Sequence, residues 1–312
     1  MAAYLIRRLW QMVPTLVGVV LLVFFLFKFF GGDPAEILGG LNATPEQVDV
    51  IRQQLGLNEP LLTQLWIFVK QILTFDWGRS WATNESVANL FATRLPATLT
   101  VMVPILVLDV VLAIPFALAV AYVRGSLTDR AIMIVSTVAL SISFLVYVIV
   151  GQYVFAFQLG LFPVQGWSDS LWTNLAVYVP LPLLLTVLVG LAPQTRLYRT
   201  FFLDEIGQDY VRTARAKGLT ETTILLKHVL RNAMIPILTN VAVALPGIFV
   251  GSFLIETFFS IPGLGREVLL AVNRSDYPVI QAITVYIAVI TMLVNLMTDV
   301  LYKLADPRVV LK

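Results

Sequence analysis

The 312-residue chain contains no cysteine and a single histidine, His228. The lack of cysteine excludes a disulfide framework, a thiolate metal site and a redox dithiol. A single histidine excludes a metal cluster built from several histidines. Charge is also scarce, since 13% of the residues are charged and the formal net charge is +2. Such a chain has no dense basic surface for a phosphate backbone, which argues against nucleic acid as a partner.

Motifs for nucleotide binding and hydrolysis are missing as well. The sequence has no GxxxxGK[ST] loop, so we expect it to bind no nucleotide by that route. HExxH and GxSxG are also absent, and no apolar stretch carries a pair of facing carboxylates. We therefore expect a protein that is not an enzyme and that binds no cofactor itself.

Apolar residues, by contrast, make up 58% of the chain. A water-soluble fold cannot bury so much apolar surface, because about half of a globular chain must face water. Six long apolar stretches predict an all-α integral membrane protein with six transmembrane helices, because lipid permits only helices or closed barrels. The stretches are residues 9–27, 95–123, 131–168 (helical over its first two-thirds), 170–195, 232–255 and 277–298.

The basic residues orient these helices through the positive-inside rule. With the N-terminus in the cytoplasm, 14 lysines and arginines fall on the cytoplasmic side and 6 on the outside, and six spans return the C-terminus to the cytoplasm. The chain then divides into the N-terminus with the first helix (1–30), an external segment (31–94) and a membrane core with helices two to six (95–312). Within the external segment, a helix is predicted over 45–55 with Thr44 as its N-cap.

Asp109 lies in the middle of the second apolar stretch. A carboxylate at that depth costs a few kcal/mol on insertion scales, so it should face the bundle interior or water. Two roles are open for it. It could line a substrate path and attract an ammonium group, or it could form a hydrogen bond to a Ser, Thr, Asn or Tyr of another helix.

A cytoplasmic segment, 196–231, carries seven basic and four acidic residues. Its central part predicts a short helix of about two turns, with Asp209 as the N-cap and Gly218 closing the helix in the left-handed conformation. Thr220 can then cap a second helix that runs through His228 into the fifth apolar stretch.

The short helix carries small residues, Ala214 among them, which would let another protein approach closely, and it carries Arg212 and Arg215 on a shared face. The alternative is a basic amphipathic loop that rests on anionic lipid.

The sequence of this segment resembles that of a known protein family. DYVRTARAKGL at 209–219, followed by KHVLRNAMIP at 227–236, is similar to the cytoplasmic coupling loop of ABC importer permeases, in particular the B-type subunit of the dipeptide/oligopeptide/nickel branch. Further short matches occur in the same order along almost the whole chain. They are YLIRRL at 4–9, VPTL at 13–16, GDPA at 32–35, ET at 256–257, PGLG at 262–265, DYP at 276–278, NL at 295–296, Asp299 and DPR at 306–308.

The general permease pattern is Glu-Ala-Ala, three residues, Gly, nine residues, then Ile-x-Leu-Pro. Aligned on Gly218, this chain shares only Ala214, Gly218 and Leu230 with that pattern. The departures are those of the peptide/nickel branch, so they argue against a sugar or amino-acid permease.

The resemblance implies a multi-pass subunit of the bacterial inner membrane that forms half of a translocation pathway for di- or oligopeptides or similar solutes. It implies four kinds of partner: a second permease, two cytoplasmic ABC ATPases that bind ATP and Mg, an external solute-binding protein and membrane lipid. The residues expected in the ATPase-coupling loop are Glu205, Asp209, Arg212, Ala214, Arg215 and Gly218.

Two questions stay open on the sequence. The alternative function is a secondary transporter or channel that works without an ATPase. The substrate could be a dipeptide, a longer peptide, a glutathione-like compound, a peptide antibiotic or a nickel chelate, since all of these fall within the branch.

Overall fold

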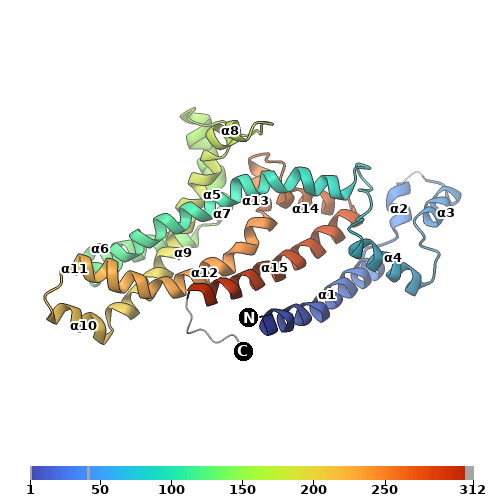
Figure 1. The fold of residues 1–312 in the computed structure, drawn as a ribbon. Coiled ribbons are helices and arrows are strands. Elements are labelled where there is room, and N and C mark those ends of the chain that lie inside the picture. The colour runs from blue at the N-terminus through green and yellow to red at the C-terminus, as the bar shows by residue number, and fades with distance from the viewer. Residues whose placement is uncertain (1, 41–42, 306–312) are drawn as a thin grey trace. The chain divides into compact units, whose positions relative to one another are not determined.

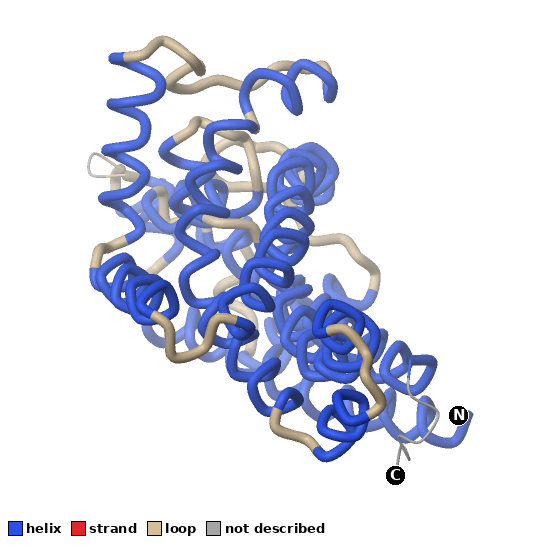
Figure 2. The backbone as a smooth tube through the Cα atoms, turned by 90° about the vertical axis from the view of Figure 1, so that its left-hand side faces the viewer, coloured by secondary structure: helices blue, strands red, loops and turns tan. Residues whose placement is uncertain are grey.

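A computed structural model describes residues 2–40 and 43–305 (Figure 1). Over these residues the regular elements are helices; no strand is assigned, and Arg79 and Ser86 form an isolated β-bridge (Figure 2). The predicted all-α class is confirmed.

Among the described residues, five helices are long and apolar enough to cross a membrane, and a sharply bent helix pair makes a sixth if it counts as one span. This agrees with the six predicted spans. The five spans lie at Ile6–Phe30, Val87–Tyr122, Pro180–Ile206, Glu221–Phe258 and Tyr277–Val300, and the bent pair consists of Leu127–Ser141 and Phe144–Gln158.

The chain forms two compact units. The first contains residues 1–96 and 263–312, and the second contains residues 97–262. Helix α5 (Val87–Tyr122) contributes its first turns to the first unit and the rest to the second.

In the first unit, α1 (Ala2–Phe30) packs along α15 (Tyr277–Ala305) (Figure 1). Arg8 and Asp299 form an ion pair of 3.1 Å between these two helices. The segment predicted to be external folds into α2 (Pro34–Gly39), α3 (Pro45–Gln54) and α4 (Leu61–Leu73), and α14 (Leu264–Asn273) precedes α15.

Side-chain caps define the short helices of this segment. Thr44 and Gln47 form a capping box at the start of α3, as predicted for Thr44. Asp33 caps α2 by accepting a hydrogen bond from the backbone N–H of Ala35, and its second oxygen accepts from Arg52 of α3. Although burial raises the pKa of Asp33, the hydrogen bonds from Arg52 and Ala35 outweigh it and hold that pKa below its usual value.

The third predicted span is wrong as a continuous helix. Helix α6 (Leu127–Ser141) ends at an extended Ile142, and α7 (Phe144–Gly151) starts after a bend of 90° and continues into the π-helical η1 (Gln152–Gln158). No proline, glycine or charge marks this break in the sequence. At the end of α6 the carbonyl of Ala139 accepts two hydrogen bonds, one from the N–H of Ile142 at 3.3 Å and one from the hydroxyl of Tyr147 at 3.0 Å.

The fourth and fifth predicted stretches also differ in their bounds. The fourth begins with a short turn of helix, α8 (Leu171–Thr173), and the π-helical η2 (Asn174–Tyr178), after which α9 (Pro180–Ile206) extends well into the segment predicted to be cytoplasmic.

The fifth stretch, α12 (Leu230–Val250), ends at Gly251, and α13 (Phe253–Phe258) follows. Gly251 has φ +78°, and a Cβ there would lie 2.8 Å from Cγ2 of Thr98, so both conformation and space require glycine.

One hydrophobic cluster of the second unit joins α5, α9 and α12. Tyr198 and Phe202 of α9 are fully buried in it, together with Ala117 of α5 and Ile237 of α12. The same cluster includes residues of the loop that connects α9 to α12, so this loop is part of the folded core.

Candidate functional site

The loop between α9 and α12 contains a short helix, α10 (Asp209–Ala216). The prediction that Asp209 caps this helix is wrong, because Gln208 occupies the N-cap position and Asp209 is the first helical residue. There its carboxylate lies at the positive end of the helix and forms an ion pair with Arg212 at 3.3 Å. Both side chains are more than 70% exposed, so this pair contributes little to stability.

Gly218 terminates α10, as predicted. It has φ +79°. Its N–H donates to the carbonyl of Arg215 at 2.9 Å, and the N–H of Leu219 donates to the carbonyl of Ala214 at 3.3 Å. These two bonds form a Schellman motif, which reverses the chain directly after the helix. A Cβ at Gly218 would meet no atom within 4 Å, so the need for glycine here comes from the backbone conformation and not from crowding within the chain.

The inner face of α10 is fixed to the rest of the second unit. Val211 and Ala214 are buried in the core cluster that contains Tyr198 and Phe202 of α9. We expected Ala214 to lie on a face open to another protein, and that placement is wrong. Positions 211 and 214 lie on one face, so the turn that buries Val211 also turns Ala214 inward.

Glu205 fastens α9 to α10. Its Oε2 accepts a hydrogen bond of 2.6 Å from the hydroxyl of Tyr210. Burial and this hydrogen bond raise the pKa of Tyr210 to about 12, so the phenol remains a proton donor at physiological pH. Glu205 therefore acts within the chain as a tether between the two helices.

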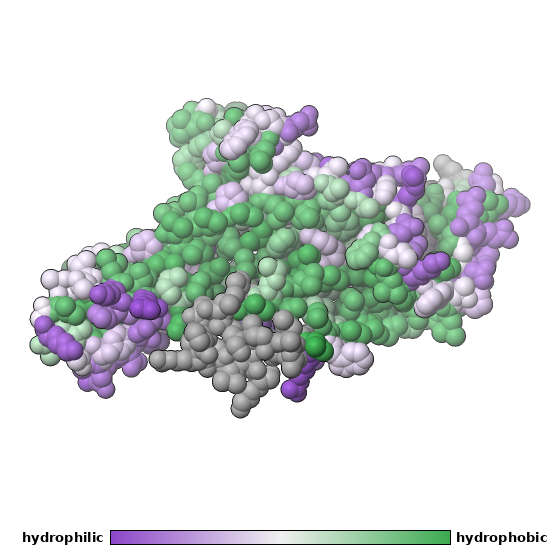
Figure 3. Space-filling view, viewed as in Figure 1, coloured by the Kyte–Doolittle hydropathy of each residue, from purple (hydrophilic) through white to green (hydrophobic). Residues whose placement is uncertain are grey.

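The outer face of α10 is polar and exposed. It presents Arg212, Thr213, Ala216 and Lys217. Figure 3 shows mainly hydrophilic side chains around α10, in contrast with the hydrophobic surface of the adjoining helices.

Arg215 is half-exposed and makes a bidentate ion pair with Glu221, with contacts of 2.7 and 3.2 Å, which holds the pKa of Arg215 above its usual value. This pair braces α10 against the next helix.

That next helix leads directly into a candidate membrane span. Thr220 caps α11 (Glu221–Thr223) by accepting from the N–H of Thr223, as predicted. The chain continues through the π-helical η3 (Ile224–Val229) into α12 without a break in helical structure. Helix α10 is thus joined to the helix that leads into α12 by the Arg215–Glu221 pair, and to α9 by the Glu205–Tyr210 hydrogen bond.

Two residues that sequence reasoning missed join α6 to α9. Asp129 of α6 is buried and accepts hydrogen bonds from Nε and Nη2 of Arg199 on α9, at 2.9 and 2.7 Å. The backbone N–H of Gly125 also donates to Asp129, at 2.9 Å. We had counted Arg199 only as a charge that orients the helices. A lone aspartate three residues after Ser126, a good N-cap, is the signal that could have pointed to a structural role.

Asp109 faces protein within the second unit. It lies against Gly190 of α9, where a Cβ would come within 2.9 Å of its Oδ1, and Gln194 of the same helix lies near it. Near them, the hydroxyl of Tyr198 donates to Oδ1 of Asn240 on α12 at 3.1 Å. The Oδ1 atom of Asp109 has no hydrogen-bond partner among the described residues. The Oε1 atom of Gln194 also has no hydrogen-bond partner among them, so both roles of Asp109 stay open.

Two substitutions of Asp109 can distinguish its two possible roles. Asp109→Asn preserves a polar group opposite Gln194 and should leave thermal unfolding unchanged. The interhelical role predicts that Asp109→Leu, which removes the polar group beside Gln194, costs about 1–3 kcal/mol. Uptake assays and thermal unfolding of both variants test this. Wild-type stability in Asp109→Leu would overturn the interhelical role, whereas reduced uptake in a fully stable Asp109→Asn would indicate a role in the pathway.

The described residues contain no group of three or more His, Cys, Asp or Glu side chains placed to hold a metal ion. What the arrangement offers is mechanical. A short helix with an exposed outer face is joined by buried contacts, one hydrogen bond and one ion pair to two helices that are long and apolar enough to span a membrane.

Comparison with known proteins places this architecture in a class of helical membrane transport components. Residues 113–311 match the family described as the inner membrane component of binding-protein-dependent transport systems, and residues 1–102 match the N-terminal domain of such components. The chain therefore belongs to this family of inner membrane components.

Similar full-length proteins carry transport names. A glutathione transport system permease protein of Salmonella choleraesuis is 35% identical over 309 residues, covering 99% of both chains. A peptide ABC transporter permease of Sinorhizobium fredii is 34% identical over 312 residues. A Brucella abortus protein is 32% identical over 314 residues, again with 99% of each chain covered. Its name describes it as a peptide transport system permease protein. The predicted family is confirmed.

Proposed function

We propose that this chain is one of the two permease subunits of a peptide-type ABC importer, and that α10 couples ATP hydrolysis on partner subunits to alternating access. The observation that carries the coupling role is the attachment of α10 to two candidate membrane spans. The Glu205–Tyr210 hydrogen bond joins it to α9, and the Arg215–Glu221 ion pair joins it to α11, which continues into α12. The names of the similar proteins support a small peptide or a glutathione-like compound as the substrate. ATP and Mg would be bound by two cytoplasmic ATPases, and an external solute-binding protein would deliver the substrate.

In this mechanism, closure of the ATPase pair pulls on the loop at 204–223. Because Val211 and Ala214 are buried and Glu205 is tethered to Tyr210, the loop cannot yield independently of α9. Its displacement would then tilt α9 and α12 together and switch the pathway between inward-open and outward-open states.

The test is reconstitution of a complex purified through a tag on this chain. We expect a second permease and two ABC ATPases to copurify, and we expect peptide uptake to require ATP and the binding protein. Uptake by the isolated chain in liposomes, without ATP, would instead support the secondary transporter or channel.

The proposed orientation, with both termini in the cytoplasm, can be tested because the chain has no native cysteine. Ser126, Ser170 and Thr220 each cap a helix, so replacing them would disturb the fold. Single cysteines are therefore placed at exposed residues whose side chains cap no helix. Cysteines replacing Glu59 and Asp169 should react with an impermeant maleimide added outside. Cysteines replacing Thr128 and Thr222 should react only after the membrane is opened. External labelling at position 222 would overturn this topology.

A further inference from the structure

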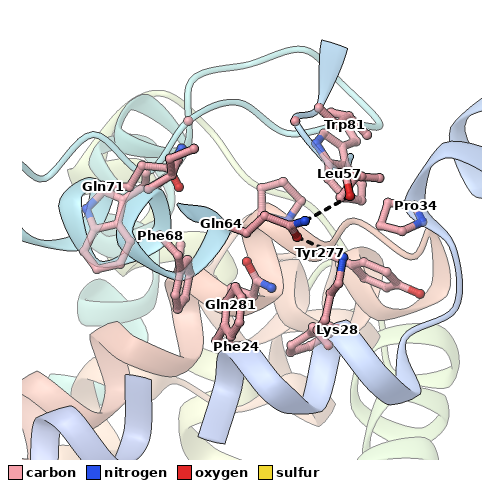
Figure 4. A pocket seen from close by; sticks show the side chains of 18 of the residues that line it. Phe24, Lys28, Pro34, Leu57, Gln64, Phe68, Gln71, Trp81, Tyr277 and Gln281 are labelled. Atoms are coloured by element: carbon pink, nitrogen blue, oxygen red, sulfur yellow. Dashed lines mark hydrogen bonds between the residues drawn. The ribbon is translucent and has the colours of Figure 1, made fainter. Parts of the chain in front are cut away.

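The first unit contains a cavity of about 290 Å³ that the transport mechanism above does not use. It is bounded by the end of α1, by α4, by the loop at 77–81 and by the start of α15 (Figure 4). Its inner wall is apolar and includes Phe24, Ile67, Phe68 and Ile72.

The helices that form the cavity indicate the level at which it would lie in a bilayer. Lys28 lies near one end of the candidate span Ile6–Phe30, and Tyr277 begins the candidate span Tyr277–Val300. Trp77, Trp81 and Tyr277 line the same region. Aromatic rings and a lysine at span ends are typical of the headgroup level of a bilayer. The apolar wall lies on the side of the hydrocarbon, and Phe29 and Phe30 at the end of α1 are exposed at the same level.

The polar part of the cavity has one sign of charge. Among the described residues that line it, the charged side chains are Lys28 and Arg79, and both are basic. The carboxylate of Asp33 lies outside this lining but close enough to Lys28 to interact with it, and it is itself paired with Arg52. Gln64 orients Lys28, since its Oε1 accepts from Nζ at 2.9 Å while its Nε2 donates to the carbonyls of Leu57 and Glu59 at 2.9 and 2.7 Å. The ammonium of Lys28 is thereby held at the cavity with N–H bonds left over for a further acceptor. In Figure 4 the amide of Gln281 lies between Gln64 and Phe24.

We propose that this cavity binds an anionic phospholipid of the surrounding leaflet, with its phosphate at Lys28 and Arg79 and an acyl chain along Phe24 and Phe68. An amphiphile of one negative charge matches both halves of the lining. A free peptide fits less well, because its terminal ammonium would find no carboxylate among the described residues that line the cavity. The amides of Gln64 and Gln281 can hydrogen-bond the glycerol ester groups. This proposal does not depend on the substrate that the protein transports.

The experiment measures binding of phosphatidylglycerol to the purified full chain by native mass spectrometry in a neutral detergent. The variant is Lys28→Gln combined with Arg79→Gln. The matched control, Lys70→Gln with Arg274→Gln, removes two exposed basic residues that do not line the cavity. The affinity should fall roughly thirtyfold in the cavity variant and little in the control, because each basic residue near an anionic headgroup contributes about fivefold. Thermal unfolding checks that both variants are folded.

Three further probes decide the ligand. Phosphatidylcholine with the same acyl chains should bind equally weakly to the wild type and to the cavity variant. Gln281→Trp, which fills the cavity and keeps its charge, should also reduce binding of phosphatidylglycerol. Equal phosphatidylglycerol affinity in cavity variant and control would overturn the proposal. Displacement of the lipid by glycerol 3-phosphate alone would show a simple anion site, and displacement by a dipeptide would show a peptide site; either result would also overturn it.

Discussion

Gly218→Glu should abolish peptide uptake by the assembled importer while leaving the chain folded and inserted. Within the chain, a side chain at Gly218 meets no atom within 4 Å, so the direct cost is that of a left-handed glutamate, about 1 kcal/mol. Toward the proposed ATPase partner, however, the added carboxylate would project from the exposed end of α10, next to Lys217. Docking of an ATPase on this surface would be blocked sterically and by charge. Uptake and binding-protein-stimulated hydrolysis should fall together by roughly tenfold or more, which is about 1.4 kcal/mol or more of lost coupling.

The control for this prediction is Gly160→Glu. Gly160 has φ +61°, and a Cβ there also meets no atom within 4 Å, so the same substitution has the same conformational cost. Gly160 lies between η1 and α8, far along the chain from α10. Copurification of the ATPases and their stimulated activity are measured for both variants. If Gly218→Glu transports as well as Gly160→Glu, the coupling role of α10 is lost.

The features that sequence reasoning predicted correctly are local. The left-handed Gly218, the Thr44 capping box and the Thr220 cap each depend on a few neighbouring residues whose backbone preferences are strong. The apolar stretches were equally predictable, because bilayer thickness fixes the length that a helix needs.

The features that it missed depend on distant contacts. Ala214 is small enough to face either its own chain or a partner, and only packing against α9 decides that it is buried. The bend after Ser141 carries no proline, glycine or charge, so an uncharged stretch concealed it. Asp129 and Arg199 are 70 residues apart, and neither one alone indicates the other.

Removing Asp129 should destabilise the protein far more than removing any exposed carboxylate of the loop between α9 and α12. Asp129→Ala removes the two carboxylate oxygens that accept hydrogen bonds from the guanidinium of Arg199, whose side chain is 18% exposed. It also removes the acceptor of the Gly125 N–H. Breaking a buried ion pair by removing one partner typically costs about 3–5 kcal/mol. Since the pair joins α6 to α9, we also expect lower uptake even where the variant still assembles.

Asp209→Ala is the matched control, because it breaks the exposed Asp209–Arg212 pair at the start of α10 and should change stability by less than about 1 kcal/mol. Thermal unfolding in detergent measures both variants, together with Arg199→Leu and the double variant Asp129→Ala/Arg199→Leu. If the pair acts as described, the double variant should be more stable than the sum of the two single losses, because no charge remains buried without its partner. Strict additivity of the two losses, or an Asp129→Ala variant as stable as Asp209→Ala, would show that α6 and α9 are held together by apolar packing alone.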